Sequence, residues 1–199
     1  MAKIILMTHQ KGGVGKSTIT YNVATNLHKE AKIKTCIVDM DNQGSLLSLS
    51  LSGISDIEIF PASELDKVIN SDYNFIFIDT PPYMSNHLTD LYEKADVIVI
   101  PTKAGIFDLF AIKSTIDLIS KQGCEDKALI VFNMIKPNTS LTDEIKSALV
   151  DYGVTVSQNM LSDLVSFSRS SLTKGVEDNE KAQNQIDALT AEILQMTYS

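Results

Sequence analysis

A segment rich in lysine and glycine near the N-terminus carries the residues best suited to chemistry. This segment, HQKGGVGKST at residues 9–18, follows an apolar run and precedes a helical pattern. Its glycines let the backbone curl so that successive N–H groups point inward at phosphate oxygens. Lys16 can supply charge to the β- and γ-phosphates, and the Ser17 hydroxyl can bind Mg²⁺. We therefore predict a phosphate-binding loop made by Gly12, Gly13, Val14, Gly15, Lys16, Ser17 and Thr18.

Two letters of this loop depart from the usual pattern. The pattern G-x-x-x-x-G-K-[ST] requires a glycine at position 10, where this chain has Gln10, and a second lysine, Lys11, follows directly. The alternative is a glycine-rich turn with a chance Gly-Lys-Ser. The position of the loop between an expected strand and an expected helix, together with two acidic segments, argues against that alternative.

The two acidic segments end other apolar runs. CIVDMDNQGS, at residues 36–45, carries Asp39 and Asp41, and FIFIDTPPYMS, at residues 75–85, carries Asp79. Asp39 and Asp41 project to the same side of a strand end and repel, unless a cation or its waters separate them. Asp79 follows four apolar residues, as does the acid that holds the metal in many nucleotide sites. The alternatives are capping or turn acids for the first pair and a buried strand-end acid for Asp79. Together the three segments predict a site for a magnesium–nucleotide complex.

The elements that must position these segments alternate in a β-α-β-α rhythm. The apolar runs are continuous, as expected of strands buried on both faces of a parallel sheet. Expected strands cover 3–8, 35–39, 74–79, 96–101 and 127–133, and expected helices cover about 16–30, 62–70, 86–95, 107–121 and 140–151. A tail helix carries Ile186, Leu189, Ile193 and Leu194 on one face. We predict an α/β fold with a doubly wound, mostly parallel sheet flanked by helices, which binds its ligand beyond the carboxyl ends of the strands.

Composition sets further limits. With 199 residues, 44% of them apolar and 21% charged, the chain is expected to form one domain over 1–199, including a mobile, serine-rich surface segment at 44–55. The two cysteines, Cys36 and Cys124, stand in unrelated contexts and indicate neither a disulfide framework nor a metal site. No apolar run is long enough for a signal peptide or a membrane span, which predicts a cytoplasmic protein. A net charge of −8 argues against broad binding to bare nucleic acid.

These motifs together resemble the ParA/MinD family of deviant Walker A ATPases. The family signature K-G-G-x-x-K-[ST] is met at residues 11–17, D-x-D-P-Q-G at 39–44 with Asn42 in place of proline, and D-T-P-P at 79–82. Segments 101–112 and 169–193 also resemble the family, so the likeness covers almost the whole chain and favours short ParA-type partition proteins. The resemblance implies a P-loop NTPase fold, ATP and Mg²⁺ as cofactors, a homodimer formed with ATP, and slow ATP hydrolysis stimulated by a ParB-type activator.

The resemblance also implies roles for single residues. In the family, the extra lysine reaches phosphates bound by the partner subunit, so Lys11 would act both in binding and in catalysis across the dimer. The other implied roles are phosphate binding by Lys16, orientation of the attacking water by Asp41, Mg²⁺ binding by Ser17 and Asp79, support of the metal's water shell by Asp39, and adenine contact by Asn133.

Binding of non-specific DNA, and with it association with the nucleoid, is less well supported by the residues. Where many ParA proteins carry arginines, this chain reads Ser162-Asp163-Leu164, and Arg169 and Lys174 are the cations nearby. A MinD-like regulator is the alternative within the fold. The tail helix has acidic residues against a single lysine, Lys181, so we expect it to pack on the domain and not to form a stable membrane anchor.

Three alternatives come from other functional classes. An ATP-gated adaptor would act on a protein or a membrane, and a metabolic ligase or kinase of the same fold would bind a small substrate at the strand ends. An iron-protein-type reductase would need paired cysteine ligands, which Cys36 and Cys124 do not offer.

Overall fold

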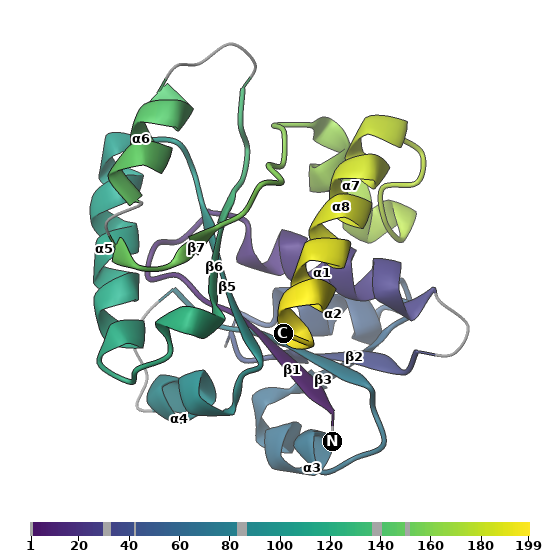
Figure 1. The fold of residues 1–199 in the computed structure, drawn as a ribbon. Helices are drawn as coiled ribbons and strands as arrows, with labels where there is room; N and C mark the ends of the chain where they lie inside the picture. Colours follow the sequence, from purple (N-terminus) through teal and green to yellow (C-terminus); the bar gives the residue numbers. More distant parts are fainter. Residues whose placement is uncertain (1, 30–32, 42, 83–86, 137–140, 150–151) are drawn as a thin grey trace.

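The computed structural model describes residues 2–29, 33–41, 43–82, 87–136, 141–149 and 152–199. In these residues a parallel sheet has seven strands in the order β3-β2-β4-β1-β5-β6-β7 (Figure 1). The strands are β1 (Lys3–Met7), β2 (Thr35–Asp39), β3 (Glu58–Pro61), β4 (Phe75–Asp79), β5 (Val97–Thr102), β6 (Ala128–Phe132) and β7 (Thr155–Val156). The predicted α/β fold with a doubly wound parallel sheet is therefore confirmed.

The strands predicted from continuous apolar runs are the inner strands of this sheet. All five residues of β2, β4 and β6 are buried, because helices cover both faces. The two strands at the edges, β3 and β7, were not predicted. Their sequences, EIFP and TV, are too short and too polar to give a periodic signal.

The helices divide into two layers (Figure 1). One layer packs on the sheet face that carries Ile5 and Met7, and the other on the face that carries Ile4 and Leu6. The first layer is α1 (Lys16–His28), α2 (Ser45–Leu51), α7 (Val165–Thr173) and α8 (Glu180–Thr197). The second is α3 (Leu65–Ile69), α4 (His87–Lys94), α5 (Ile106–Ser120) and α6 (Leu141–Leu149).

The serine-rich segment 44–55 differs from its prediction as a mobile surface segment, because it begins with the helix α2. Leu46 is buried against the core, and the Asp39 carboxylate accepts the N–H groups of Leu46 and Leu47 at 3.0 Å. These two bonds satisfy amides of the first helical turn that would otherwise lack partners. The capping acid lies on another element, so the segment's own composition did not indicate a helix.

The tail helix α8 packs on the body of the protein, as predicted. Ile186, Leu189 and Ile193 are buried in the same cluster as residues of α1, and Leu194 packs against that cluster. Within the described part of the chain, no helix combines the length and the apolar character needed to cross a membrane.

Candidate nucleotide site

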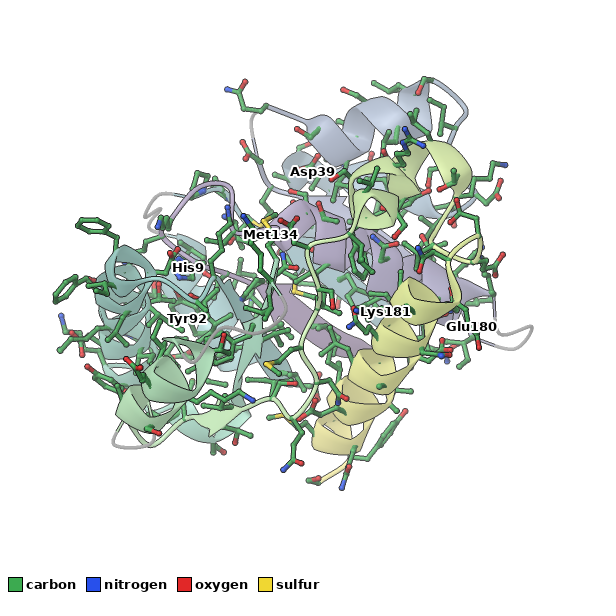
Figure 2. All side chains as sticks on the ribbon, turned by 90° about the horizontal axis from the view of Figure 1, so that it is seen from above. His9, Asp39, Tyr92, Met134, Glu180 and Lys181 are labelled. Atoms are coloured by element: carbon green, nitrogen blue, oxygen red, sulfur yellow. The ribbon has the colours of Figure 1, made fainter. Side chains whose placement is uncertain are left out.

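The three segments predicted to bind nucleotide converge at the carboxyl ends of β1, β2 and β4. The parallel register pairs Asp79 with Met7 on one side and with Asp39 on the other. Figure 2, seen from above, shows Met134 between His9 and Asp39, and Glu180 and Lys181 beside α8. A cavity of about 270 Å³ opens here, lined by Gly12, Gly13, Gly15, Lys16, Ser17, Thr18, Asp41, Pro82 and Met134.

The phosphate loop keeps its shape through glycines and one buried amide. Gly13 and Gly15 have φ values of 69° and 95°, a region that glycine occupies without a steric penalty. A Cβ on residue 15 would lie 2.1 Å from Asn133 Nδ2, and that same nitrogen donates to the Val14 carbonyl at 2.8 Å. Asn133 thus fixes the loop from the end of β6. Its contact with adenine stays a prediction.

Lys16 places a buried cation at the cavity. Lys16 is 7% exposed. Burial lowers the pKa of its amine, and the negative charges of Asp79 and Asp41 oppose this by raising the pKa. The ammonium donates to the His9 carbonyl at 3.3 Å. An ammonium has three donors, so this long bond leaves capacity for phosphate oxygens. The amine and the surrounding backbone therefore fit a phosphate group.

Asp79 is the buried acid of the site. Burial, with a further contribution from Asp39, raises its pKa to about 7, against the effect of hydrogen bonds from Ser17 and Thr20 and of the charge on Lys16. Ser17 Oγ donates to Asp79 Oδ2 at 2.5 Å, and Thr20 Oγ1 donates to Oδ1 at 3.2 Å. Burial disfavours the ionised form of this carboxyl group, and the charge of a nearby Mg²⁺ would favour it. The carboxylate and the neighbouring Ser17 hydroxyl are both oxygen ligands of the kind that Mg²⁺ prefers.

The rest of the metal's ligands would come from outside the protein. In the described residues there is no group of three or more His, Cys, Asp or Glu side chains that could hold a metal. Mg²⁺ usually keeps several water ligands and binds through one or two protein groups together with phosphates. Thr20 was not predicted, although it lies one helical turn after Ser17 and faces the same carboxylate.

The two acids of the β2 end have different surroundings. Asp41 lines the cavity and accepts the Gln43 N–H at 3.0 Å, and its orientation of the attacking water stays a prediction. Asp39 is 4% exposed and accepts three backbone N–H groups, those of Asp41, Leu46 and Leu47. Capping was the alternative interpretation for this acid, and it is the role that Asp39 has here. Its support of a metal's water shell stays a prediction.

Lys11 differs from Lys16 in where its side chain lies. The described residues that line the cavity do not include Lys11, whose ammonium is 2.7 Å from Asp108 Oδ1 on α5. The Lys11 N–H donates to His9 Nδ1 at 2.9 Å, and His9 is 1% exposed. Sequence reasoning identified neither Asp108 nor His9 as a partner of Lys11, because no local motif links them to it.

The two residues predicted to contact DNA lie on or just after α7, and neither of them lines the cavity. Arg169 is exposed, and the Lys174 ammonium pairs with Asp56 Oδ1 at 2.6 Å. Nearby, Lys29 pairs with Glu177 at 2.6 Å. Two of the cations in this region are therefore neutralised within the chain, and DNA binding by Arg169 and Lys174 stays a prediction.

Comparison with known proteins identifies the family. Residues 5–175 match the model of the CobQ/CobB/MinD/ParA nucleotide binding domain. The chain belongs to this family. Among its relatives, maintenance of carboxysome distribution protein A of Halothiobacillus neapolitanus is 27% identical over 165 residues, which are 76% of each chain.

Solved structures of ParA/MinD ATPases share the fold. A plasmid partition protein from Borrelia burgdorferi bound to AMPPNP superposes with a TM-score of 0.77 at 18% identity, covering 98% of this chain and 99% of its own. The MinC:MinD cell division complex of Aquifex aeolicus gives 0.77 at 15% identity, covering 98% and 96%. This chain therefore has the nucleotide-binding P-loop fold of ParA/MinD ATPases.

Proposed function

We propose that this protein is a Mg-ATP-dependent, dimerising ATPase of ParA type. It partitions or positions a plasmid, a mobile element or another cargo, and a ParB-type partner stimulates its slow hydrolysis. The observation that carries the proposal is the different position of two lysine side chains. Lys16 enters the phosphate cavity of its own chain, whereas Lys11 is held outside that cavity.

This difference suits a nucleotide-dependent dimer. A lysine that lies outside its own phosphate cavity can contact phosphates bound by a second copy once it leaves Asp108, in the manner of an arginine finger supplied by a partner. The bound nucleotide would then decide whether the protein is a monomer or a dimer. The terminal phosphate of ATP supplies negative charge that offsets the repulsion between the two facing lysines.

The remaining residues serve the reaction within one chain. Ser17 and Asp79 would hold Mg²⁺, which supplies charge to offset the negative charge on the transferred phosphoryl group. Asp41 faces the same cavity and would orient the attacking water. Lys16 and the loop amides fix the phosphates, and Asn133 keeps the loop in shape through the Val14 carbonyl.

An exposed apolar surface adjoins Lys11 and supports docking of a second copy. Ile106, Phe107 and Phe110, on the first turns of α5, are 62%, 81% and 66% exposed, around the Asp108 that pairs with Lys11. Contiguous apolar surface of this kind usually marks an interaction site. Covering it in a dimer would add hydrophobic stabilisation to the lysine–phosphate contact.

Sedimentation of the protein with a non-hydrolysable ATP analogue and Mg²⁺ tests the proposal. We expect a dimer with the analogue and a monomer with ADP. Lys11→Ala should bind the analogue as a monomer, whereas the control Lys181→Ala, changed at an exposed position of α8, should dimerise normally. A Lys11→Ala protein that dimerises like the parent would contradict the role of Lys11 across the dimer.

A second candidate, an ATP-gated adaptor that acts on another protein, is favoured by the outer face of α7. Val165 and Leu172 are 67% and 70% exposed, and they flank Arg169 at helical spacing. This face offers more apolar surface than charge, while Lys174 is already paired with Asp56.

Gel shifts with DNA separate the two candidates. The Asp41→Ala protein, expected to hold ATP without hydrolysing it, is compared with ATP, with ADP and without nucleotide over a series of salt concentrations. Binding that needs ATP and falls steeply with salt supports the DNA-based ParA function. Lack of binding at every salt concentration supports the adaptor.

A further inference from the structure

An ion pair within the chain holds the side chain of Lys11. The Lys11 ammonium lies 2.7 Å from Asp108 Oδ1, with side-chain exposures of 37% for the lysine and 10% for the aspartate. The two residues are 97 positions apart, so the pair joins the phosphate loop to the first turn of α5. A mostly buried carboxylate strengthens such a pair beyond what two fully exposed charges would give.

The backbone of Lys11 is fixed as well. Its N–H donates to His9 Nδ1 at 2.9 Å, and Figure 2 shows His9 on the side of the molecule that α5 occupies. Burial, followed by the charge on Lys16, lowers the pKa of His9 to about 4. The imidazole therefore stays neutral near pH 7 and keeps accepting this bond. Lys11 is held at both ends, by His9 at the peptide and by Asp108 at the ammonium.

The start of α5 is built to place Asp108 in this position. A Cβ on residue 105 would lie 2.6 Å from Asp108 Oδ2, so the carboxylate reaches its place because Gly105 has no side chain. The Asp108 N–H donates to the Gly105 carbonyl at 3.0 Å, which fixes the turn. Glycine and aspartate three residues apart thus form one local unit that faces the phosphate loop.

We propose that Asp108 is a positioning residue that holds the Lys11 ammonium away from phosphate, so that dimerisation must exchange this internal ion pair for a phosphate on the partner subunit. The inference rests on the proposed function, since it takes Lys11 as the group that acts between two copies. Each dimer opens two such pairs. The free energy lost by opening them is offset where the partner's terminal phosphate takes the place of Asp108. With ADP that phosphate is missing, so the pairs stay closed and the chains stay monomeric.

The first measurement is the dimer dissociation constant of Asp108→Asn, determined by sedimentation with Mg²⁺ and a non-hydrolysable ATP analogue. Opening one partly buried pair is expected to raise the dimer dissociation constant about three- to tenfold. Because each dimer opens two pairs, the variant should dimerise about ten- to a hundredfold more tightly than the parent. The control is Asp117→Asn, which removes the same charge from an exposed Lys113–Asp117 pair at 2.9 Å on the same helix. Dimerisation of the control should equal that of the parent.

The second measurement tests the ion pair without any dimer. Nucleotide-free monomers are treated with an amine-acylating reagent, and labelling of Lys11 is followed by mass spectrometry. An ammonium held by a carboxylate reacts more slowly, so Asp108→Asn should label Lys11 several-fold faster than the parent does. Asp117→Asn should speed the labelling of Lys113 and leave Lys11 unchanged. Thermal unfolding checks the folding of each variant, and Asp108→Ser replaces Asp108→Asn should the latter be unstable.

The outcomes separate this inference from the function on which it rests. Equal labelling of Lys11 in parent and variant would overturn the ion pair and the inference with it. Faster labelling with an unchanged dissociation constant would overturn the regulation while leaving the dimerising function in place. Parent and variant that both stay monomeric with the analogue would overturn the proposed dimer, and with it any regulation by Asp108.

Discussion

The phosphate cavity and the region around α7 and α8 differ in the burial and pairing of their charged side chains. At the cavity, Lys16 and Asp79 are 7% and 1% exposed. Burial lowers the pKa of Lys16 and raises the pKa of Asp79, so it favours the neutral form of both side chains. Around α7, Lys174 and Lys29 are exposed enough to meet water and pair with Asp56 and Glu177.

The difference shows where the molecule stores electrostatic free energy for a ligand. Buried charges with incomplete partners are unfavourable until groups of opposite charge reach them. Exposed ion pairs that already have partners contribute little and have little to gain. Substitutions in the two regions should therefore differ in size and in kind.

The largest effect should come from Lys16→Ala. Removing a buried cation that faces the phosphates should lower nucleotide affinity by about a thousandfold, or about 4 kcal/mol. Titration with a fluorescent ATP analogue measures the affinity, and Lys181→Ala, changed on the exposed face of α8, serves as the control. Unchanged affinity in Lys16→Ala would show that the loop does not bind phosphate.

Gly15→Ala should come next, as a loss of folding stability. The new Cβ would clash with Asn133 Nδ2 at 2.1 Å, in a backbone with φ of 95°. We expect the free energy of unfolding to fall by roughly 3 kcal/mol. Gly53→Ala is the matched control, because φ there is 69° and nothing lies within 4 Å of the added Cβ. That variant should lose about 1 kcal/mol in urea unfolding, and equal losses would remove the role of the Asn133 contact.

A third effect depends on pH, through His9. Burial and Lys16 lower its pKa from 6.5 to about 4 in the folded protein. The unfolded chain therefore binds the proton first, so stability is lost as pH falls from about 6.5 toward 4. Between pH 7.5 and pH 5 this loss amounts to about 2 kcal/mol.

The measurement compares urea unfolding of the parent and of His9→Asn at those two pH values. Asp79, whose pKa is raised to about 7, gives the opposite slope in the same range, and it is common to both proteins. The parent should therefore lose about 2 kcal/mol more than the variant on acidification. Parallel curves would mean that His9 is protonated as easily in the folded chain as in the unfolded one.

The smallest effect should come from Lys174→Ala on the α7 side. Its pair with Asp56 is exposed, so stability should change by no more than about 0.5 kcal/mol, as thermal unfolding can show. Nucleotide affinity should not change at all. A loss of several kcal/mol would erase the contrast between the two regions.

The sequence predicted the inner strands and the position of the glycine-rich loop at the cavity, because both depend on local patterns. Continuous apolar runs indicated β1, β2, β4, β5 and β6, and the glycine and lysine spacing indicated the cavity. Individual side-chain partners were harder to predict. The Asp108 partner of Lys11 lies 97 positions away, and only the fold brings the two together. The Asp39 cap on α2 spans only seven and eight residues, and it corresponds to the capping alternative for that acid. The short edge strands β3 and β7 were missed because a few residues of mixed polarity carry no period.

The three amide bonds to Asp39 give the protein a built-in reporter. The N–H groups of Asp41, Leu46 and Leu47 all end on one carboxylate, which stands in register with Asp79 on the neighbouring strand. We therefore expect the deuterium exchange of these amides to depend on the position of that carboxylate, so that a ligand that moved Asp39 would speed the exchange of all three together. Ligand binding at the cavity would then be measurable at the first turn of α2 as a change in exchange rate.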